Sequence, residues 1–433
     1  MQFSELPLDH RLLKALEIQN FVEPTEIQKS TIPAALSGKD VLAASKTGSG
    51  KTLAYLVPAV QRLYRHKALS KQDPRILVVT PTRELAMQVY QESKKLLAGA
   101  MHKPTLLIGG ENFNNQVKAL KKNPDVIIGT PGRIADHIED RSLFLAGLEL
   151  LIFDEADRIL DLGFSTQLQI INDSANHRKR QTMLFSATFD SGDIRDVSDT
   201  LLIAPHKVLV DDFRQVHQDI EQAFIFADHL DHKEALLSKL LLEVEDREQI
   251  IVFVATRDDS ERLRDVLNSD GKAAAALHGE LLQQQRNQIM SDFRNNKAQI
   301  LVTTDVASRG LDIPQVKLVI NFDMPIKATE YVHRVGRTGR AGNQGIAFSL
   351  VGKKDWKNFV VLKELIQSEI QVKEIEGMVA QFKGFKEHLK KRKPKSQPKT
   401  KGTVARQKAK PKNKFDATAG TEVGHLPLKR KQN

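Results

Sequence analysis

The sequence predicts an α/β protein with two tandem domains, each built on a mostly parallel sheet, followed by a basic tail. Three observations lead to this fold class. Short β-branched runs alternate with longer helical segments such as 82–98, TRELAMQVYQESKKLLA, which is typical of a parallel sheet with helices on both faces. The alternation begins again after residue 216, and Lys and Arg concentrate after residue 383. The 433 residues are enough for two such domains and an extension.

The predicted strands fall into two groups. The first group consists of the runs at 40–45, 75–80, 125–130, 148–153 and 182–188. The second group consists of the runs at 223–228, 249–256, 273–279, 299–304, 317–323 and 346–351. We therefore expect domains at about 1–205 and 216–375, joined by a short linker.

Polar residues end many of these strands. They are Ser45, Thr80, Thr130, Asp154, Ser186, Thr256 and Thr304. Ligands of open α/β sheets bind at the carboxyl ends of the strands, which meet at one edge of the sheet. The row of polar strand ends therefore predicts an active edge.

Composition favours a soluble cytosolic protein. Hydrophobic residues make up 40% of the chain and charged residues 27%, so most of it can form a core. No apolar run approaches the roughly 20 residues needed to span a bilayer, and the first residues lack the basic and apolar regions of a secretory signal. The absence of cysteine excludes disulfides, cysteine-based zinc sites and cysteine nucleophiles. We expect a cytoplasmic location and no membrane partner.

The positive charge of the chain lies in its last part. Residues 383–433 contain 17 Lys and Arg against 3 Asp and Glu, a charge of +14, whereas the whole chain has +11, so the remainder sums to −3. The tail is rich in Pro and Lys and poor in large apolar residues, which predicts disorder. Its natural partner is a polyanion, with nucleic acid ahead of an anionic membrane.

A phosphate-binding loop is predicted between the first strand and the next helix. The segment 45–52, SKTGSGKT, fits the pattern G-x-x-x-x-G-K-[ST] except that Ser45 takes the first glycine position. In such a loop, backbone N–H groups and the helix dipole attract phosphates, the lysine reaches the β- and γ-phosphates, and the threonine ligates Mg²⁺. The order strand, loop, helix argues against the alternative, an ordinary glycine-rich turn. The predicted nucleotide-binding residues of the loop are Ser45, Lys46, Thr47, Gly48, Ser49, Gly50, Lys51 and Thr52.

Three carboxylates, Asp154, Glu155 and Asp157, crowd the end of the apolar strand 148–153. Without compensation they would repel one another and lose hydration. A strand-terminal Asp is where a P-loop enzyme holds Mg²⁺, and the next carboxylate can take a proton from a water aligned on the γ-phosphate. We therefore expect Asp154, together with Thr52, to hold Mg²⁺ and Glu155 to act as the base. The alternative, a solvated acidic turn, is less favoured because the sequence also contains a P-loop.

The second domain contains the arginine-rich segment 333–340, HRVGRTGR. Its glycines let the backbone bend close to a ligand, and arginine is suited to stabilising charge on a transferring γ-phosphoryl group. Because the second domain has no P-loop of its own, the economical interpretation is one nucleotide in a cleft between the two domains. The alternative is a plain anion- or RNA-binding loop.

Residues 1–375 strongly resemble the DEAD-box RNA helicases, which are named for the tetrapeptide at 154–157. The resemblance rests on many motifs in family order, so it is far more specific than a P-loop alone. The segment 20–28, NFVEPTEIQ, resembles the family's Q motif. The resemblance implies that Phe21 packs on adenine and that Gln28 hydrogen-bonds its edge.

Other motifs of the resemblance imply further site residues. RNA contacts are implied for Arg83, Gly110, Thr130, Arg133, Gln283, Arg286 and Thr304. Coupling of hydrolysis to RNA is implied for Asp157, Ser186, Thr188 and His333. Asp312 is implied to hold the ribose, and Arg337 and Arg340 to meet the γ-phosphate, with Arg340 nearest to an arginine finger. The catalytic residues would be Lys51, Asp154, Glu155, Arg337 and Arg340.

The resemblance also implies the domain organisation, with two tandem RecA-like domains. It comprises a Q-motif segment at 1–29, an ATP-binding RecA-like domain at 30–205, a linker at 206–215, a C-terminal RecA-like domain at 216–375 and a basic, largely disordered tail at 376–433.

The implied function is that of an ATP-dependent RNA helicase, which hydrolyses ATP in the interdomain cleft and locally unwinds short RNA duplexes or remodels RNA–protein complexes. ATP and Mg²⁺ would be its cofactors, and single-stranded and short duplex RNA its partners. The chain is similar to bacterial members that act in ribosome assembly or RNA decay. This similarity implies ribosomal precursor particles or RNA-decay proteins as further partners. Asn20, Ser45 and Glu280 depart from the family pattern, where Gly, Ala and Asp are usual, but none of these changes removes a ligand or base.

Two other functions compete with this one. An RNA-binding scaffold or annealer would be favoured if the P-loop, acid or arginine motif were damaged, and all three are intact. A DNA-translocating helicase is the third candidate, because the preference for RNA comes from the resemblance rather than from identifiable 2′-hydroxyl contacts.

Overall fold

The computed structural model describes residues 1–45, 48–70, 72–187, 192–210, 220–242, 248–308, 316–339, 344–365 and 370–385. These ranges belong to one compact unit that runs from Met1 to Phe385. The predicted site residues Lys46, Thr47, Thr188, Asp312 and Arg340 and the chain beyond residue 385 lie outside the described residues. Within the described ranges we find no helix that combines the length and apolar character needed to cross a bilayer.

The first sheet has seven strands, all parallel, in the order β3-β4-β2-β5-β6-β1-β7. Its strands are β1 (Val41–Ala44), β2 (Ile76–Val79), β3 (Pro104–Leu107), β4 (Val126–Gly129), β5 (Leu150–Phe153), β6 (Gln181–Ser186) and β7 (His206–Leu209). The sequence predicted five of them. It missed the two edge strands, β3 and β7, and assigned β7 to the linker at 206–215.

Both missed strands lack the apolar pattern of the central ones because they pair on one side only. In β7 only Val208 is buried, and the strand is held in the sheet by parallel pairing with β1. Strand β3 begins with a proline and has three half-buried residues, which fits a sheet edge. The first domain therefore extends through residue 209.

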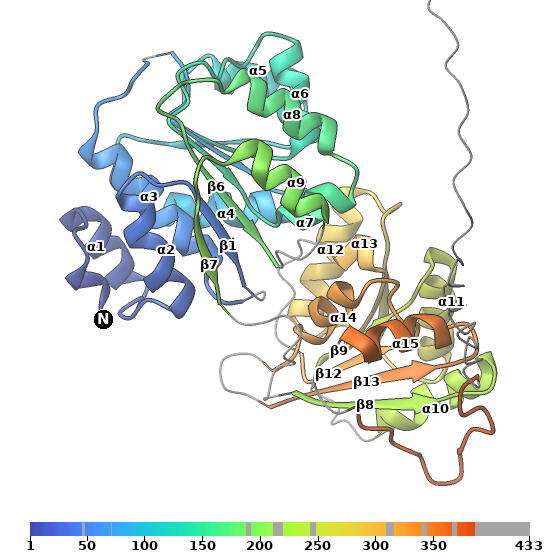
Figure 1. Cartoon of the computed structure of the whole chain (residues 1–433). Helices are drawn as coiled ribbons and strands as arrows, with labels where there is room; N and C mark the ends of the chain where they lie inside the picture. Colours follow the sequence, from blue (N-terminus) through green and yellow to red (C-terminus); the bar gives the residue numbers. More distant parts are fainter. Residues whose placement is uncertain are drawn as a thin grey trace, which may run out of the picture. The chain divides into compact units, whose positions relative to one another are not determined.

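Alternate residues of each central strand enter two separate cores, one on each face of the first sheet. In β5, Leu150 and Ile152 pack on one face, whereas Leu151 and Phe153 pack on the other. Helices α1 to α4 contribute to the first core and α5 to α9 to the second (Figure 1). These helices, with a preceding 3₁₀ turn at Phe3–Glu5, are α1 (His10–Ile18), α2 (Glu26–Leu36), α3 (Lys51–Arg65), α4 (Arg83–Leu96), α5 (Phe113–Leu120), α6 (Pro131–Glu139), α7 (Ala156–Asp161), α8 (Ser165–Ser174) and α9 (Gly192–Leu201).

The second sheet has six parallel strands in the order β10-β11-β9-β12-β13-β8. Its strands are β8 (Ile220–Phe226), β9 (Ile250–Phe253), β10 (Ala274–Leu277), β11 (Ile300–Thr303), β12 (Leu318–Asn321) and β13 (Gly345–Val351). Its helices are α10 (Leu230–Leu242), α11 (Arg257–Ser269), α12 (Gln283–Arg294), α13 (Asp305–Ser308), α14 (Ala328–Val335) and α15 (Trp356–Leu365). Helices α10 and α11 pack on one face and α12 to α15 on the other. The predicted fold class of two parallel-sheet α/β domains is confirmed.

The described chain continues past the predicted domain end at 375 because it returns to the second sheet. Val372 forms a parallel bridge with Phe224 of β8. Asp228 then accepts hydrogen bonds from the backbone N–H groups of Gln381 and Phe382, at 3.1 and 2.7 Å. This return covers the outer edge of β8, which would otherwise present unpaired backbone groups.

Candidate functional site

The P-loop and the acidic tetrapeptide lie at the same edge of the first sheet. Because all seven strands are parallel, their carboxyl ends share one edge. Strand β1 leads into the loop and β5 into the acids, and β6 lies between these two strands. At the end of β6, the carbonyl of Ser186 accepts a hydrogen bond from the Ser45 N–H at 3.3 Å. The residues predicted at a common active edge are therefore neighbours in space.

The described part of the P-loop curls over its own first residue. Lys51 opens helix α3, and its Nζ donates a hydrogen bond to the Ser45 carbonyl at 2.8 Å. The hydroxyls of Ser45 and Ser49 are 2.6 Å apart. Gly50 has a φ of 94°, a left-handed conformation that suits glycine. Lys51 is thus held at the first residue of the loop. Loops of this kind bind phosphates at the start of the following helix.

Gln28 ties the Q motif to this loop. Its Nε2 donates to the Gly50 carbonyl at 2.9 Å, and its Oε1 accepts from the Thr25 N–H at 3.0 Å. Thr25 and Gln28 form a capping box at the start of α2, so the glutamine is fixed by the helix that carries it. A Cβ at Gly50 would overlap the Gln28 amide. Sequence reasoning did not find this contact.

Asn20 has a structural reason to replace glycine. It follows helix α1 with a φ of 60°, and its N–H donates to the Glu17 carbonyl while the Phe21 N–H donates to the Leu16 carbonyl. This is the Schellman arrangement, which needs a left-handed residue that glycine supplies best and asparagine tolerates. The turn leaves the ring of Phe21 partly exposed, at 38%.

The acidic tetrapeptide makes a sharp turn from strand β5 into helix α7. Glu155 adopts φ 49° and ψ 52°, which is a left-handed conformation for a residue with a Cβ. Its backbone N–H donates to Asp154 Oδ1 at 3.0 Å. The other oxygen of Asp154 accepts a 2.8 Å hydrogen bond from the hydroxyl of Tyr55 in helix α3.

The three carboxylates are incompletely compensated. Burial raises the pKa of Asp154, Glu155 and Asp157, and Lys51 is among the cations that oppose this rise. One oxygen of Asp157 accepts from the Ala187 N–H at 3.3 Å, whereas its other oxygen is buried without a hydrogen bond. Added positive charge at this edge of the sheet would therefore stabilise the three carboxylates.

The arginine-rich segment begins on helix α14 of the second domain. Arg334 is buried, and Asp305 accepts from its Nε and Nη2 at 2.6 and 2.8 Å. Asn321 and the Asp323 carbonyl accept from its Nη1. Arg334 therefore holds its own domain together. Arg337 is close enough to Glu155 to lower the pKa of that carboxyl against the larger effect of burial.

Helix α7 of the first domain contacts helix α14 of the second. Arg158, the residue after the tetrapeptide, forms a buried ion pair with Glu330 and also contacts His333 Nδ1. Burial, and then Arg158, hold the pKa of His333 well below its usual value, which favours the neutral ring. A more exposed pair, Lys327 with Asp161, joins the same two helices. Sequence reasoning named His333 but missed Arg158 and Glu330.

Predicted RNA-contact residues of the first domain also gather at its carboxyl edge. The guanidinium of Arg83 lies against Gly109 and Gly110, and a Cβ at Gly110 would overlap it. Arg133 donates to the Glu111 carbonyl at 3.0 Å. Thr130 is the N-cap of the helix that carries Arg133. Arg83, Gly110 and Thr130 come after β2, β3 and β4, whose carboxyl ends lie at one edge of the sheet.

The predicted RNA-contact pair of the second domain reaches the first domain. Arg286 Nη2 lies 2.9 Å from Glu84 Oε1 and also donates to the Ala307 carbonyl at 3.1 Å. Gln283 donates to the same Glu84 oxygen at 3.2 Å. Glu84 was not singled out from the sequence, although it neighbours Arg83. Thr304, at the end of β11, is nearly buried.

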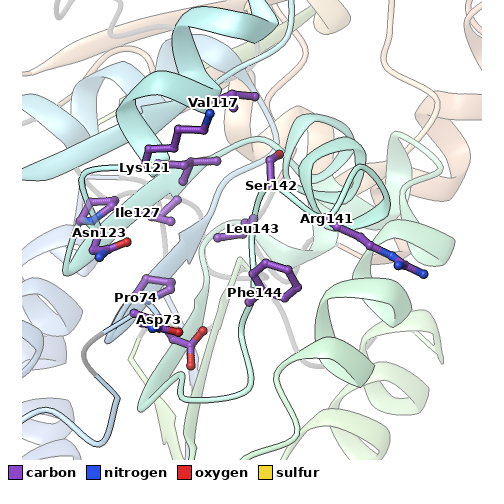
Figure 2. A pocket seen from close by; sticks show the side chains of 13 residues that line it. Asp73, Pro74, Val117, Lys121, Asn123, Ile127, Arg141, Ser142, Leu143 and Phe144 are labelled. Carbon is purple, nitrogen blue, oxygen red and sulfur yellow. The ribbon is translucent and has the colours of Figure 1, made fainter.

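A cavity of about 410 Å³ lies away from these groups (Figure 2). Pro74 and Pro124 in its lining precede strands β2 and β4, so the cavity opens at the amino ends of the strands, opposite the P-loop. Leu143 and Phe144 line it as well, and Arg141 extends away from it in Figure 2. The candidate site is therefore separate from this cavity.

Comparison with known families agrees with this geometry. The profile described as DEAD/DEAH box helicase matches residues 25–197, and the helicase conserved C-terminal domain matches residues 232–342. The chain is 42% identical over 353 residues to the ATP-dependent RNA helicase SrmB of Escherichia coli, covering 82% of this chain and 79% of SrmB. It is 43% identical over 373 residues to the ATP-dependent RNA helicase DRS1 of Eremothecium gossypii, covering 84% of this chain but only 50% of DRS1.

Solved structures show the same fold. Mss116p bound to single-stranded RNA and AMP-PNP matches with a TM-score of 0.77 and 30% identity, covering 86% of this chain and 78% of that one. Dbp5 of S. cerevisiae bound to RNA and ADP BeF3 matches with a TM-score of 0.75 and 28% identity, covering 86% and 95%. The predicted RecA-like fold and family resemblance are confirmed: this chain belongs to the DEAD/DEAH box helicase family.

Proposed function

We propose that this chain is an ATP-dependent RNA helicase that hydrolyses ATP between its two domains and locally opens short RNA duplexes or remodels RNA–protein complexes. One observation carries the proposal. The P-loop lysine and the acidic tetrapeptide share one sheet edge. Arg158, next to the tetrapeptide, is paired with Glu330 of the other domain and contacts His333, the first residue of the arginine-rich segment. The relatives named above are ATP-dependent RNA helicases, which supports the same activity.

The nucleotide contacts follow from the positions of the side chains. Phe21 offers an exposed ring for the adenine, and Gln28 keeps one N–H and one lone pair for the base edge after its two protein hydrogen bonds. We assign the phosphates to the loop 45–52 and to Lys51, which would exchange the Ser45 carbonyl for a phosphate oxygen. For Asp312 and Arg340 we propose the ribose and γ-phosphate roles that the family resemblance implies.

We propose that Thr52 and Asp154 hold Mg²⁺. The donor set is oxygen, the unpaired oxygen of Asp157 and the raised pKa values indicate uncompensated negative charge, and Mg²⁺ favours such sites. The described residues contain no cluster of three or more His, Asp or Glu side chains that could hold a metal by itself, so phosphate oxygens would complete the shell. Bound there, the ion would neutralise charge on the phosphates.

Glu155 is proposed as the general base. Its left-handed backbone turns the carboxylate out of the strand, and burial raises its pKa toward the range in which proton transfer is efficient. Arg337 would face the charge that develops on the γ-phosphoryl group. Asp157, Ser186, Thr188 and His333 are proposed to couple this step to RNA, since the first two lie at the nucleotide edge and His333 contacts Arg158.

RNA is proposed to lie across the carboxyl edges, where backbone phosphates would meet arginines rather than base-reading groups. The first domain supplies Arg83, Gly110, Thr130 and Arg133, and the second supplies Gln283, Arg286 and Thr304. The two sets are linked by Glu84, which contacts Gln283 and Arg286.

One experiment separates the proposed function from its competitors. ATP hydrolysis by the full chain is measured alone, with single-stranded RNA and with single-stranded DNA of the same sequence. We expect RNA, but not DNA, to stimulate ATP hydrolysis. Equal stimulation by DNA would favour a DNA-translocating helicase, and RNA binding without hydrolysis would favour a scaffold or annealer.

The basic tail is proposed to add salt-dependent affinity for RNA. Its charge of +14 over residues 383–433 predicts that deleting these residues weakens RNA binding and makes log affinity less steep against log salt. An unchanged slope would assign the tail to another partner. A cytoplasmic location, and ribosomal precursor particles or RNA-decay proteins as partners, belong to the same proposal.

A further inference from the structure

Helix α3 places a tyrosine beneath the proposed Mg²⁺ site. Tyr55 lies four residues after Lys51, so both side chains are on the same face of the helix. Its side chain is fully buried, at 0% exposure. The ring meets Phe185 of strand β6 edge-on, with centroids 5.2 Å apart and planes at 61°. The helix and the sheet therefore fix the position of the ring.

The hydroxyl of Tyr55 has a specific acceptor. It donates to Asp154 Oδ2 at 2.8 Å. Burial, and then the negative charge of Asp154, raise the pKa of Tyr55 well above its usual 10, so the hydroxyl keeps its proton. The tyrosine thus contacts Asp154 directly and shares helix α3 with Thr52, the other residue assigned to Mg²⁺.

The two oxygens of Asp154 are held from opposite sides. Oδ2 accepts from Tyr55, and Oδ1 accepts from the Glu155 N–H at 3.0 Å. The backbone bond is fixed by the left-handed turn at Glu155, but it leaves the carboxylate free to pivot. The tyrosine bond removes that freedom. Groups behind a metal ligand commonly set its orientation and strengthen binding in this way.

We propose that Tyr55 is a positioning residue for the Mg²⁺ site, and that its hydroxyl orients Asp154 and keeps it in register with Thr52. The inference rests on the proposed function, because it takes Asp154 and Thr52 as the residues that hold the ion. A different account is that Tyr55 is an ordinary core residue, whose hydroxyl needs any available acceptor. The two accounts differ in what phenylalanine would do, since phenylalanine fills the same space without the hydroxyl.

The test is a Mg²⁺ titration of nucleotide binding by the full chain and its Tyr55→Phe variant. Binding of a fluorescently labelled ADP is followed at increasing free Mg²⁺, and once with EDTA. We expect the midpoint of the Mg²⁺ titration to rise by about 10- to 100-fold, the usual effect of losing a group behind a metal ligand. Affinity in EDTA should match the parent, because the pocket keeps its shape.

A matched control lies on the same helix. Tyr64 is half-buried, and the Arg11 guanidinium lies 4.0 Å from the centre of its ring. It is near the end of helix α3 that is opposite the P-loop. Tyr64→Phe makes the same chemical change and should leave the Mg²⁺ midpoint at the parental value. Thermal unfolding of both variants in EDTA checks that each is folded.

The outcomes separate the inference from the proposed function. A parental midpoint in folded Tyr55→Phe would overturn the positioning role. An equal loss of affinity with and without Mg²⁺ would also overturn it, because the effect would then be one of packing. Parental protein whose nucleotide binding ignores Mg²⁺ would instead contradict the proposed assignment of Asp154 and Thr52, and the inference would fail with it.

Discussion

The carboxyl edge of the first sheet carries acids and that of the second carries arginines and a histidine, and the two sets are compensated differently. In the first, burial raises the pKa of all three tetrapeptide carboxyls, and an oxygen of Asp157 is left without a hydrogen bond. In the second, Arg334 has acceptors on Asp305, Asn321 and the Asp323 carbonyl. The second edge supports its own fold, whereas the first is built for something that is added to it.

This difference explains how two similar sheets can divide one reaction. On the proposed assignment the first edge would bind the nucleotide, because the accompanying Mg²⁺ would offset the negative charge of its acids. The second edge holds helix α14 in place, because Arg334 of that helix donates to Asp305, Asn321 and the Asp323 carbonyl. The contact between Arg158 and Glu330 then joins the two edges. If this division holds, damage to the first edge should remove chemistry and damage to the contact should remove coupling.

The largest effect is expected from Glu155→Gln in the first edge. The amide keeps the size of the side chain but removes the basic oxygen, so hydrolysis should fall by about 10²- to 10⁴-fold. Nucleotide binding should persist, because Asp154 and Lys51 are untouched. Single-turnover hydrolysis with saturating RNA measures the first quantity and labelled ADP binding the second. Turnover near the parental rate would remove the base role from Glu155.

The next effect is expected from Arg158→Met at the contact between the edges. It removes the buried ion-pair partner of Glu330, and breaking a buried pair from one side costs about 3–5 kcal/mol. RNA-stimulated hydrolysis should therefore fall strongly while labelled ADP still binds the first domain. Lys327→Ala is the matched control, because it breaks the pair with Asp161 between the same helices, and Lys327 is 58% exposed. Similar losses in both variants would contradict a special role for the buried pair.

A smaller effect concerns a buried histidine of the first domain. Burial, and then Arg133, lower the pKa of His137 from 6.5 to about 4, while Asp136 and Asp140 oppose the shift. The contribution of His137 to the unfolding free energy is complete above pH 6.5 and is lost as pH falls toward 4. In this window the unfolded chain binds a proton at His137 that the folded chain does not bind. The contribution is up to about 3 kcal/mol. The unfolding free energy of His137→Gln should depend less on pH over this window, as urea denaturation would measure, and parallel curves would refute the assignment.

The smallest effect is expected from Glu84→Gln, which weakens the link between the RNA-contact residues of the two sheets. The pair with Arg286 is mostly buried, so its loss should cost about 1 kcal/mol, or about a fivefold higher RNA concentration for half-maximal hydrolysis. RNA titrations of the ATPase measure this. Tighter RNA binding would mean that Glu84 competes with RNA for Arg286 instead of positioning it.

The sequence predicted the elements that have a regular apolar pattern and the motifs whose residues follow a fixed spacing. Central strands were found because both of their faces are buried, as Leu150 to Phe153 illustrate. The loop and the tetrapeptide were found because phosphate and metal chemistry restricts the residues and their order. Strand β7 was assigned to a linker because an edge strand buries one residue in four.

Contacts between distant segments could not be predicted in the same way. Arg158 and Glu330 are 172 positions apart, and nothing in either segment names the other. Tyr55 reads as a core residue of an amphipathic helix, since its hydroxyl gains meaning only from Asp154, 99 residues later. Asn20 was noticed as a departure from the family pattern, but its left-handed backbone became visible only in the structure.

Glu155 is proposed to act on the reaction, whereas Asp154 is proposed to act on the assembly of the site. The direct measurement is the rate at which labelled single-stranded RNA dissociates from Glu155→Gln and from Asp154→Asn in excess ATP and Mg²⁺. We expect Glu155→Gln to release RNA more slowly than the parent, because the closed complex forms and cannot hydrolyse its ATP. Asp154→Asn should release RNA quickly, because weakened metal binding prevents closure. Equal release rates for the two variants would contradict the division of roles between the base and the metal ligand.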